Sequence, residues 1–283
     1  MGFQAASVGL GEIKYMFEYE HYYQLIKTGC INKATEYRAS FVPNYLYKFI
    51  SLSSDISLNN KKLKTLENSS IWLSSYTQLN DPYELSGMYI DIDKLTRLGY
   101  QANDIDYLQR LFEGLKNTMY IASFTDSMTN NLPMWAHYAN NHKGFCVKYL
   151  VKNKLSIRNV IYESQRIQMA RTLEGYIQMD RQHINEEIEA RNTFYSILIS
   201  EIFNLKHISW HSENEYRLLY PSEEVSSTGF EVSLDEVGLE ISEVYSGYKC
   251  SPDYQCKLDN ICSVLGVKHY RCNLSDTEYI VFE

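Results

Sequence analysis

The fold is constrained most by short runs rich in aromatic and β-branched residues, which recur in both halves of the chain and end at turn residues. Runs of this length and composition are typical of β-strands. In the first half, the sequence predicts strands at 44–50, 71–74, 120–124, 145–149 and 159–162. In the second half, it predicts strands at 216–220, 239–245, 264–270 and 279–282. We expect 159–162 to lie beside 145–149 in the sheet.

Apolar residues at helical spacing predict helices at 11–27, 61–68, 105–119 and 134–141. A longer helical region, about 164–206, separates the strand-rich halves, and its charged residues are expected to form a solvated face. The pattern predicts an α+β fold: a single domain with a mixed, mainly antiparallel sheet, flanked by helices and carrying this long helical insertion. We expect residues 1–44 to form an N-terminal helical extension of a domain that spans 45–283.

The charge of the chain bears on its partners and its location. Its 283 residues carry a formal net charge of −8, which argues against extensive nucleic-acid binding. The sequence has no apolar run long enough to cross a membrane as a helix, and no signal peptide. We therefore expect a cytoplasmic protein without a membrane partner.

The six cysteines are expected to be free thiols. Four of them lie near the end of the chain: Cys250, Cys256, Cys262 and Cys272. Their spacing does not match the Cys-x-x-Cys pairs of structural zinc sites, and a chain of this size without a signal peptide is expected in a reducing compartment. We expect no metal, and a metal site is the less favoured alternative.

The densest group of side chains that can stack, donate or titrate lies at residues 134–146. On a helix, His137 and Tyr138 share one face, and His142 falls near it. A histidine beside a tyrosine and Trp135 can orient a ligand by stacking and by one hydrogen bond. The alternative is a core aromatic cluster in which the histidines are satisfied.

A second candidate site is the pair Glu213 and Glu215, followed by Arg217. In a strand, these side chains point to one face. Two neighbouring carboxylates raise each other's pKa, and an arginine two residues on lowers it. Such a pair can bind a ribose diol and stabilise a cationic sugar transition state. The alternative is a surface ion pair at the edge of a sheet.

Two shorter stretches offer further polar groups, with a structural role as the alternative for each. Tyr47 and Lys48 lie on the first predicted strand, and Asn80 and Asp81 begin an Asn-Asp-Pro turn after the second. The sequence has no Gly-rich phosphate loop, no His-Glu-x-x-His and no Gly-x-Ser-x-Gly. Nucleotide hydrolases of the P-loop type, zincins and α/β-hydrolases therefore lose support.

Four motifs, in the same order, resemble the bacterial DUF2971 family over roughly residues 45–220. They are Leu-Tyr-Lys-Phe at 46–49, Leu-Asn-Asp-Pro-Tyr-Glu at 79–84, Ser-Phe at 123–124 leading to Met-Trp-x-His-Tyr-Ala-x-x-His-x-Gly-Phe at 134–145, and Lys-x-x-x-Trp-x-x-Glu-x-Glu-Tyr-Arg at 206–217. The Trp-His-Tyr segment is the most specific of them. The first 40 residues and the cysteine-bearing tail lie outside the resemblance.

DUF2971 looks distantly similar to ADP-ribosyltransferase-type domains. That similarity implies a basic residue on the first strand, a small polar residue on a later strand, and glutamates near a late strand. Lys48 takes the first place, Ser74 or Ser123 the second, and Glu215 with Glu213 the third. Lys48 departs from the usual arginine or histidine, and the second place stays open between the two serines.

The resemblance implies an enzyme that uses NAD as its substrate, transferring ADP-ribose or cleaving the nicotinamide bond, as a toxin or anti-phage effector. Glu215 would stabilise the oxocarbenium-like ribose, and Glu213 would activate the acceptor. The expected partners are a nucleotide, a macromolecular acceptor, and an antitoxin or defence protein. The expected ligand-binding residues are Tyr47, Lys48, Asn80, Asp81, Ser123, Trp135, His137, Tyr138, His142 and Arg217. The alternative is a non-catalytic module that senses a nucleotide or a phage protein.

Overall fold

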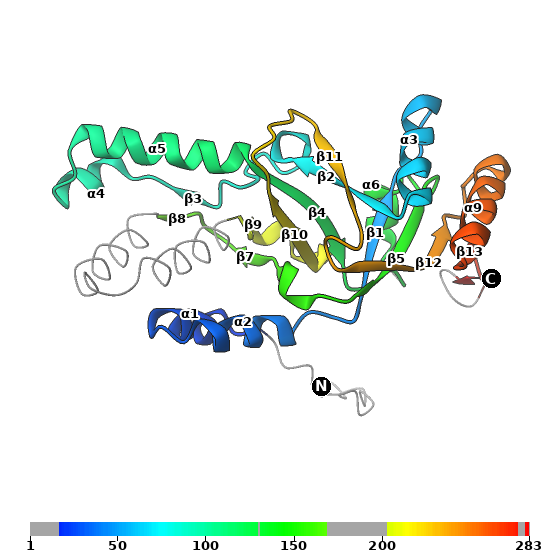
Figure 1. Cartoon of the computed structure of the whole chain (residues 1–283), viewed down its shortest axis with the longest axis horizontal. Helices are drawn as coiled ribbons and strands as arrows, with labels where there is room; N and C mark the ends of the chain where they lie inside the picture. The colour runs from blue at the N-terminus through cyan, green and yellow to red at the C-terminus, as the bar shows by residue number, and fades with distance from the viewer. Residues whose placement is uncertain (1–16, 130, 169–202, 277–280, 283) are drawn as a thin grey trace, which may run out of the picture.

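One large sheet carries the fold (Figure 1). The computed structural model describes residues 17–129, 131–168, 203–276 and 281–282, and within these ranges ten strands form this sheet. The path runs β11-β2-β4-β1-β5-β12-β13-β14, and β10 pairs with β4 and with β6. The strands are β1 Tyr45–Ile50, β2 Ser70–Ser75, β4 Met119–Thr125, β5 Phe145–Val151, β6 Ile157–Asn159, β10 Glu215–Pro221, β11 Gly229–Ser233, β12 Leu239–Ser246, β13 Lys268–Asn273 and β14 Val281–Phe282.

The sheet is mixed and mainly antiparallel, as predicted, because β12 and β13 are its parallel pair among the described strands. Two small parallel pairs lie apart from it: β3 Met88–Tyr89 with β8 Ile167–Gln168, and β7 Ile161–Glu163 with β9 Leu205–His207. Helices flank the strands, so the α+β prediction is confirmed. The helices are α1 Tyr19–Lys27, α2 Ile31–Ser40, α3 Ile56–Glu67, α4 Ile92–Arg97, α5 Ala102–Asn117, α6 Leu132–Tyr138 and α9 Pro252–Leu265, with 3-10 turns η1 Tyr76–Gln78, η2 Lys154–Ser156 and η3 Ile208–Glu213.

Period-two alternation places the main core on one face of the sheet. On β10, Tyr216 and Leu218 face this core, while Glu215 and Arg217 point to the opposite face. The helices α3 and α9 contact each other and pack on the core face (Figure 1). The polar residues of β10 are therefore turned away from the main core, toward β9 and the segment that follows β2.

Three predicted helices begin or end elsewhere than expected. α5 spans Ala102–Asn117 rather than 105–119. α3 begins at Ile56 rather than Lys61, because the Asp55 side chain caps it by accepting from the Leu58 amide (3.0 Å). The helix at 134–141 is shorter than predicted. It ends at Tyr138, and three residues follow with positive φ: Asn140 (49°), Asn141 (53°) and His142 (67°).

Several strand predictions are wrong. The strand expected at 264–270 begins only at Lys268, because α9 runs to Leu265 and ends at Gly266 with φ 71°. β11 lies partly where a loop was expected. The run at 159–162 divides into β6 and β7, and its neighbours are β10 and β9 rather than β5.

The N-terminal and inserted regions are described in part. α1 ends at Lys27 as predicted, with Gly29 at φ 76°, and the first part of the predicted helix 11–27 lies outside the described residues. The helical insertion predicted at 164–206 has strands at its two ends, β8 and β9, and its interior at 169–202 lies outside the described residues. The division into 1–44 and 45–283 stays a prediction. Within the described ranges, no helix has the length and apolar character to cross a membrane.

The strand β4 forks the sheet. One edge of β4 pairs with β10 along its whole length. Its other edge pairs with β2 at Tyr120 and Ile121, and with β1 only at Thr125. Between these pairings, residues 122–124 face no described strand along that edge. β1 and β2 therefore diverge, and the fork between them opens a cavity.

Candidate functional site

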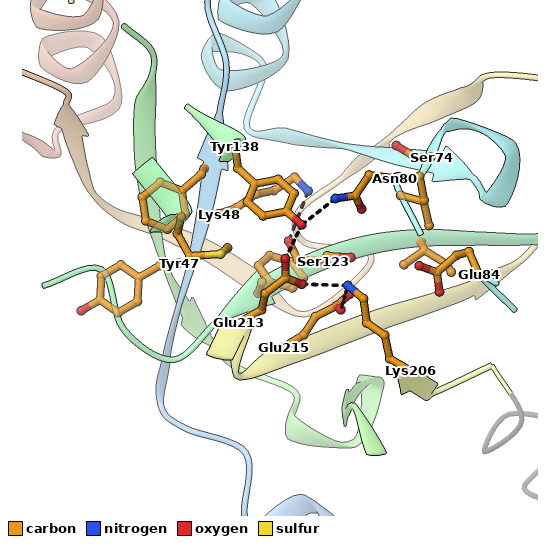
Figure 2. Close-up of a pocket in the computed structure, with 15 residues that line it drawn as sticks. Tyr47, Lys48, Ser74, Asn80, Glu84, Ser123, Tyr138, Lys206, Glu213 and Glu215 are labelled. Atoms are coloured by element: carbon orange, nitrogen blue, oxygen red, sulfur yellow. Dashed lines mark hydrogen bonds and ion pairs between the residues drawn. The ribbon is translucent and has the colours of Figure 1, made fainter. Parts of the chain in front are cut away.

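The cavity at the fork has a volume of about 130 Å³. Side chains from β1, β2, β4, α6, β9, η3, β10 and the segment after η1 line it (Figure 2). A dry cavity of about 150 Å³ is enough to hold benzene, so this cavity has room for one ring of a ligand. Its lining residues are Tyr47, Lys48, Phe49, Ser74, Leu79, Asn80, Glu84, Ile121, Ser123, Phe124, Met134, Tyr138, Lys206, Glu213 and Glu215.

A single lysine joins the two predicted carboxylates. Lys206 Nζ lies 2.7 Å from Glu213 Oε2 and 2.8 Å from Glu215 Oε2 (Figure 2). Glu213 and Glu215 therefore bind the same ammonium group, although they are not neighbours on one strand, contrary to the sequence prediction. Glu213 ends η3, and the left-handed Asn214 (φ 43°) turns the chain before β10 begins.

Arg217 closes the buried side of the network. Its Nε donates to Glu215 Oε1 (2.8 Å), and its Nη2 donates to Glu215 Oε2 (3.2 Å). Its Nη1 lies 2.6 Å from Glu84 Oε1 and donates to the Phe203 carbonyl (2.8 Å). Since the arginine side chain is fully buried, it supports the carboxylates from behind and does not line the cavity.

The network keeps Glu215 ionised. Burial alone would raise the pKa of Glu215, but Arg217 and Lys206 outweigh it and lower that pKa to about 2. For Lys206, burial acts to lower the pKa, and Glu215 reverses this, so that the pKa is raised. Burial raises the pKa of Glu84, although Arg217 opposes the effect. At neutral pH the two central groups are thus a fixed ion pair.

Tyr138 connects the aromatic stretch to the carboxylates. Its hydroxyl donates to Glu213 Oε1, and Asn80 Nδ2 donates to the same hydroxyl (3.0 Å) (Figure 2). Burial, together with Glu213, raises the pKa of Tyr138, so the phenol stays protonated and remains a donor. The predicted residues Asn80, Tyr138 and Glu213 therefore form one hydrogen-bonded wall.

Lys48 also lines the cavity, but it is not part of this ion-pair network. It is half-buried, and its Nζ donates to the Ser123 carbonyl in the fork (3.3 Å) and lies 5.6 Å from the centre of the Phe124 ring. Burial lowers the pKa of Lys48 to about 8, and the charge of Glu215 opposes that effect. Ser74 and Ser123 both line the cavity, so the choice between them stays open.

Five predicted ligand-binding residues do not line the cavity. Asp81 forms the predicted turn instead, because its Oδ1 accepts from the Tyr83 amide (2.9 Å). The others are Trp135, His137, His142 and Arg217. Trp135 is fully buried and meets Phe49 edge-on at 4.9 Å, so it belongs to the core cluster that was the alternative.

The two histidines of this stretch lie away from the fork. His137 is exposed. His142 stacks on Trp135, with ring centres 6.0 Å apart and planes at 6°, and its ring centre also lies 4.8 Å from that of Tyr248. The short helix explains this placement, because His142 lies beyond its end in left-handed backbone and does not share the face of Tyr138. The stretch contributes Met134 and Tyr138 to the cavity.

Sequence reasoning missed Lys206 and Glu84 as parts of the network. Both stand at the ends of motifs already used for the family resemblance: Lys206 opens the last motif and Glu84 closes the Asn-Asp-Pro motif. Each therefore carried a sequence signal, but nothing local indicated that these two motifs meet at Arg217 and Glu215.

Among the described residues, the cysteines and the possible metal ligands do not form a second candidate site. The six cysteines are free, and burial raises the pKa of Cys262 to about 12. In the described ranges, no group of three or more histidine, cysteine, aspartate and glutamate side chains is arranged to hold a metal ion.

Comparison with known proteins confirms the family resemblance. The family model described as "Protein of unknown function (DUF2971)" matches residues 134–218, which contain α6, β5, β10 and both glutamates of the cavity. Neither the curated proteins nor the solved structures gave a match.

Proposed function

We propose that this DUF2971 protein cleaves the bond between nicotinamide and ribose in NAD, and passes ADP-ribose to water or to a macromolecular acceptor. The observation that carries the proposal is a pair of carboxylates, Glu213 and Glu215, bound by one lysine at a cavity of ring size. In the proposed reaction the bonding electrons leave with nicotinamide, and the acceptor's oxygen or nitrogen bonds to the ribose carbon and loses its proton.

Ionised carboxylates suit this reaction because its transition state is a sugar cation. A negative group that is already in place stabilises the developing positive charge without reorganising during the reaction. The low pKa of Glu215 supports this role across the physiological pH range. Tyr138 and Asn80 supply neutral donors beside the carboxylates, which suits the hydroxyls and the amide of such a substrate.

The two carboxylates differ in what they offer a ligand. A carboxylate has about four acceptor positions. Glu215 accepts from three side-chain N–H groups, whereas Glu213 accepts from Tyr138 and Lys206. The Glu213 side chain is also the more exposed, at 11% against 4%. In contrast to the roles that the resemblance implies, we therefore assign contact with the ribose to Glu213, and to Glu215 the ionised support behind it.

Nicotinamide release from NAD by the purified full-length chain tests the proposal. We expect Glu213→Gln to lower the rate by about 10²–10³-fold, as for the loss of one preorganised group at the transition state. The matched control is Glu240→Gln, because Glu240 is an exposed glutamate of β12 that pairs with Lys152 on the surface. Equal rates for the two variants, with both folded by circular dichroism, would contradict the proposal.

One observation favours a binding module instead. The carboxylates at the cavity are already paired with cations, as in a rigid site that recognises a ligand without changing it. NAD that binds, measured by calorimetry, without nicotinamide release from the wild type would support a nucleotide sensor. The toxin or anti-phage role belongs to the enzyme proposal, because consumption of NAD depletes it in the cell.

A further inference from the structure

The charges around the cavity do not balance without Lys48. Glu84, Glu213 and Glu215 carry three negative charges when ionised. Lys206 and Arg217 carry two positive charges, and both are held in ion pairs of 2.6–2.8 Å with these carboxylates. With all three carboxylates ionised, three negative and two positive charges leave one negative charge, which a further cation near the cavity neutralises.

Lys48 supplies that charge from an unusual position. Among the described residues, no carboxylate lies within ion-pair distance of its Nζ, which donates a hydrogen bond to a neutral group, the Ser123 carbonyl. The ammonium group lies near the Phe124 ring. Lys206 is in contrast bound to two carboxylates. The proton on Lys48 is therefore the one positive charge of this cluster that can leave without breaking an ion pair.

The walls of the cavity suit an external cation. Four aromatic side chains line it: Tyr47, Phe49, Phe124 and Tyr138. Aromatic faces attract cations, and a cation that has left bulk water gains the most from them. The space is that of one ring. A flat, positively charged ring thus matches the volume of the cavity, its aromatic lining and the negative charge that its ion pairs leave.

We infer that the cavity selects a ring-sized aromatic cation, a pyridinium, and that Lys48 gives up its proton when this cation binds. The choice of a pyridinium rests on the proposed function, since the nicotinamide ring of NAD is one. The neutral amine left on Lys48 keeps its bond to the Ser123 carbonyl through a remaining N–H. The net charge of the cluster is zero before and after binding.

The other titratable groups at the cavity do not replace Lys48 as the group that releases a proton. They are Tyr47, Glu84, Tyr138, Lys206, Glu213 and Glu215. Burial raises the pKa of Glu84, but Arg217 opposes this from 2.6 Å, and a proton on Glu84 would weaken that ion pair. Burial raises the pKa of both tyrosines, so they stay neutral. Arg217 and Lys206 hold Glu215 ionised, and Glu215 in turn raises the pKa of Lys206. With a pKa of about 8, Lys48 is the group whose proton is released at small cost.

Three pyridine-ring ligands of similar size and different charge test the inference: 1-methylnicotinamide (a cation), nicotinamide (neutral) and nicotinate (an anion). Calorimetry on the full-length chain measures their affinities between pH 7 and pH 9. We expect 1-methylnicotinamide to bind best and its affinity to rise roughly tenfold over this range, because the fraction of neutral Lys48 rises about tenfold around a pKa of about 8. Nicotinamide affinity should change less than twofold. A preference for nicotinate, or a flat pH profile for the cation, would overturn the inference.

Lysine variants show whether Lys48 is the source of the pH dependence. Lys48→Met should bind the cation at pH 7 about as tightly as the wild type does at pH 9, with no proton release in buffers of different ionisation heat. Lys48→Arg, which keeps its charge, should bind the cation weakly at every pH. The control is Lys62→Met, because burial also lowers the pKa of Lys62 but this side chain bonds to Ser51 away from the cavity. Retention of the pH dependence in folded Lys48→Met would refute the assignment.

The outcome separates this inference from the proposed function. Cation binding with the expected pH profile and no nicotinamide release from NAD would retain the inference and remove the enzyme proposal. Nicotinamide release together with pH-independent cation binding would do the reverse.

Discussion

At the residue scale, Arg217 is the side chain on which the buried network depends. It is fully buried and contacts both Glu215 and Glu84. Removing one member of a buried ion pair leaves a charge without compensation, which costs far more than loss of an exposed pair. Arg217, which the sequence predicted to bind a ligand, therefore instead holds Glu215, which lines the cavity.

We expect Arg217→Met to lower the free energy of unfolding by about 3–5 kcal/mol, because Glu215 and Glu84 lose their shared partner. Arg110→Met is the matched control, since Arg110 pairs with Asp106 on the exposed face of α5, and its loss should cost less than about 1 kcal/mol. Urea denaturation at pH 7 measures both. Similar losses for the two variants would show that the buried network contributes little to stability.

At the element scale, the close approach of β1 and β5 depends on Gly144. A Cβ at this position would lie 2.0 Å from the Ile50 carbonyl oxygen, which is backbone and cannot move aside as a flexible side chain does. This glycine directly precedes β5, which lies next to β1 in the sheet. The turn glycine of the family motif is thus required by the spacing of two strands.

Two glycine-to-alanine substitutions should have opposite effects. Gly144→Ala should destabilise the fold by about 1–3 kcal/mol, as expected for an atom forced into a closely packed site. Gly114→Ala should stabilise it by about 0.5–1 kcal/mol, because Gly114 lies inside α5 with open space around it and alanine is the better helix former. Thermal unfolding measures both changes. Stabilisation by Gly144→Ala would contradict the close approach.

At the scale of the whole molecule, the N-terminal helices have a core of their own. α1 and α2 lie side by side and pack around Tyr22, Ile26 and Ala34 (Figure 1). Arg38 ties this pair to the sheet, since its guanidinium donates to the carbonyls of Ile157 and Leu155 (2.9 Å to the latter). The bonds of one buried arginine thus connect α2 to the start of β6.

Arg38→Met should loosen the N-terminal helices and leave the cavity intact. Loss of its charged hydrogen bonds, worth about 1.5–3 kcal/mol each, should speed proteolysis at residues 41–44 by roughly tenfold or more. Nicotinamide release should stay unchanged. Arg97→Met on the exposed end of α4 serves as the control, with no change in cleavage. Unchanged cleavage in Arg38→Met would mean that other contacts hold α2 in place.

Local patterns in the sequence determined the kind of fold and much of the cavity wall. Alternation along a strand and turn chemistry are properties of neighbouring residues, so β1, β2, β4, β5 and the Asp81 turn were predicted close to where they lie. The errors at α3, α6 and α9 have local causes as well. A cap at Asp55 and the left-handed residues after Tyr138 decide where those helices begin and end.

The site itself was decided by tertiary structure. The sequence placed Glu213, Glu215, Tyr138, Asn80 and Lys48 in motifs far apart along the chain, and the pairing of β10 and β1 with β4 brings them to one cavity. The same packing leaves Trp135 in the core with His142 stacked on it, and brings Lys206 and Arg217 to the carboxylates. Composition and spacing determine which side chains are available. Which of them meet, and which carry charge there, depends on strand register and burial, and these arise only when distant segments pack together.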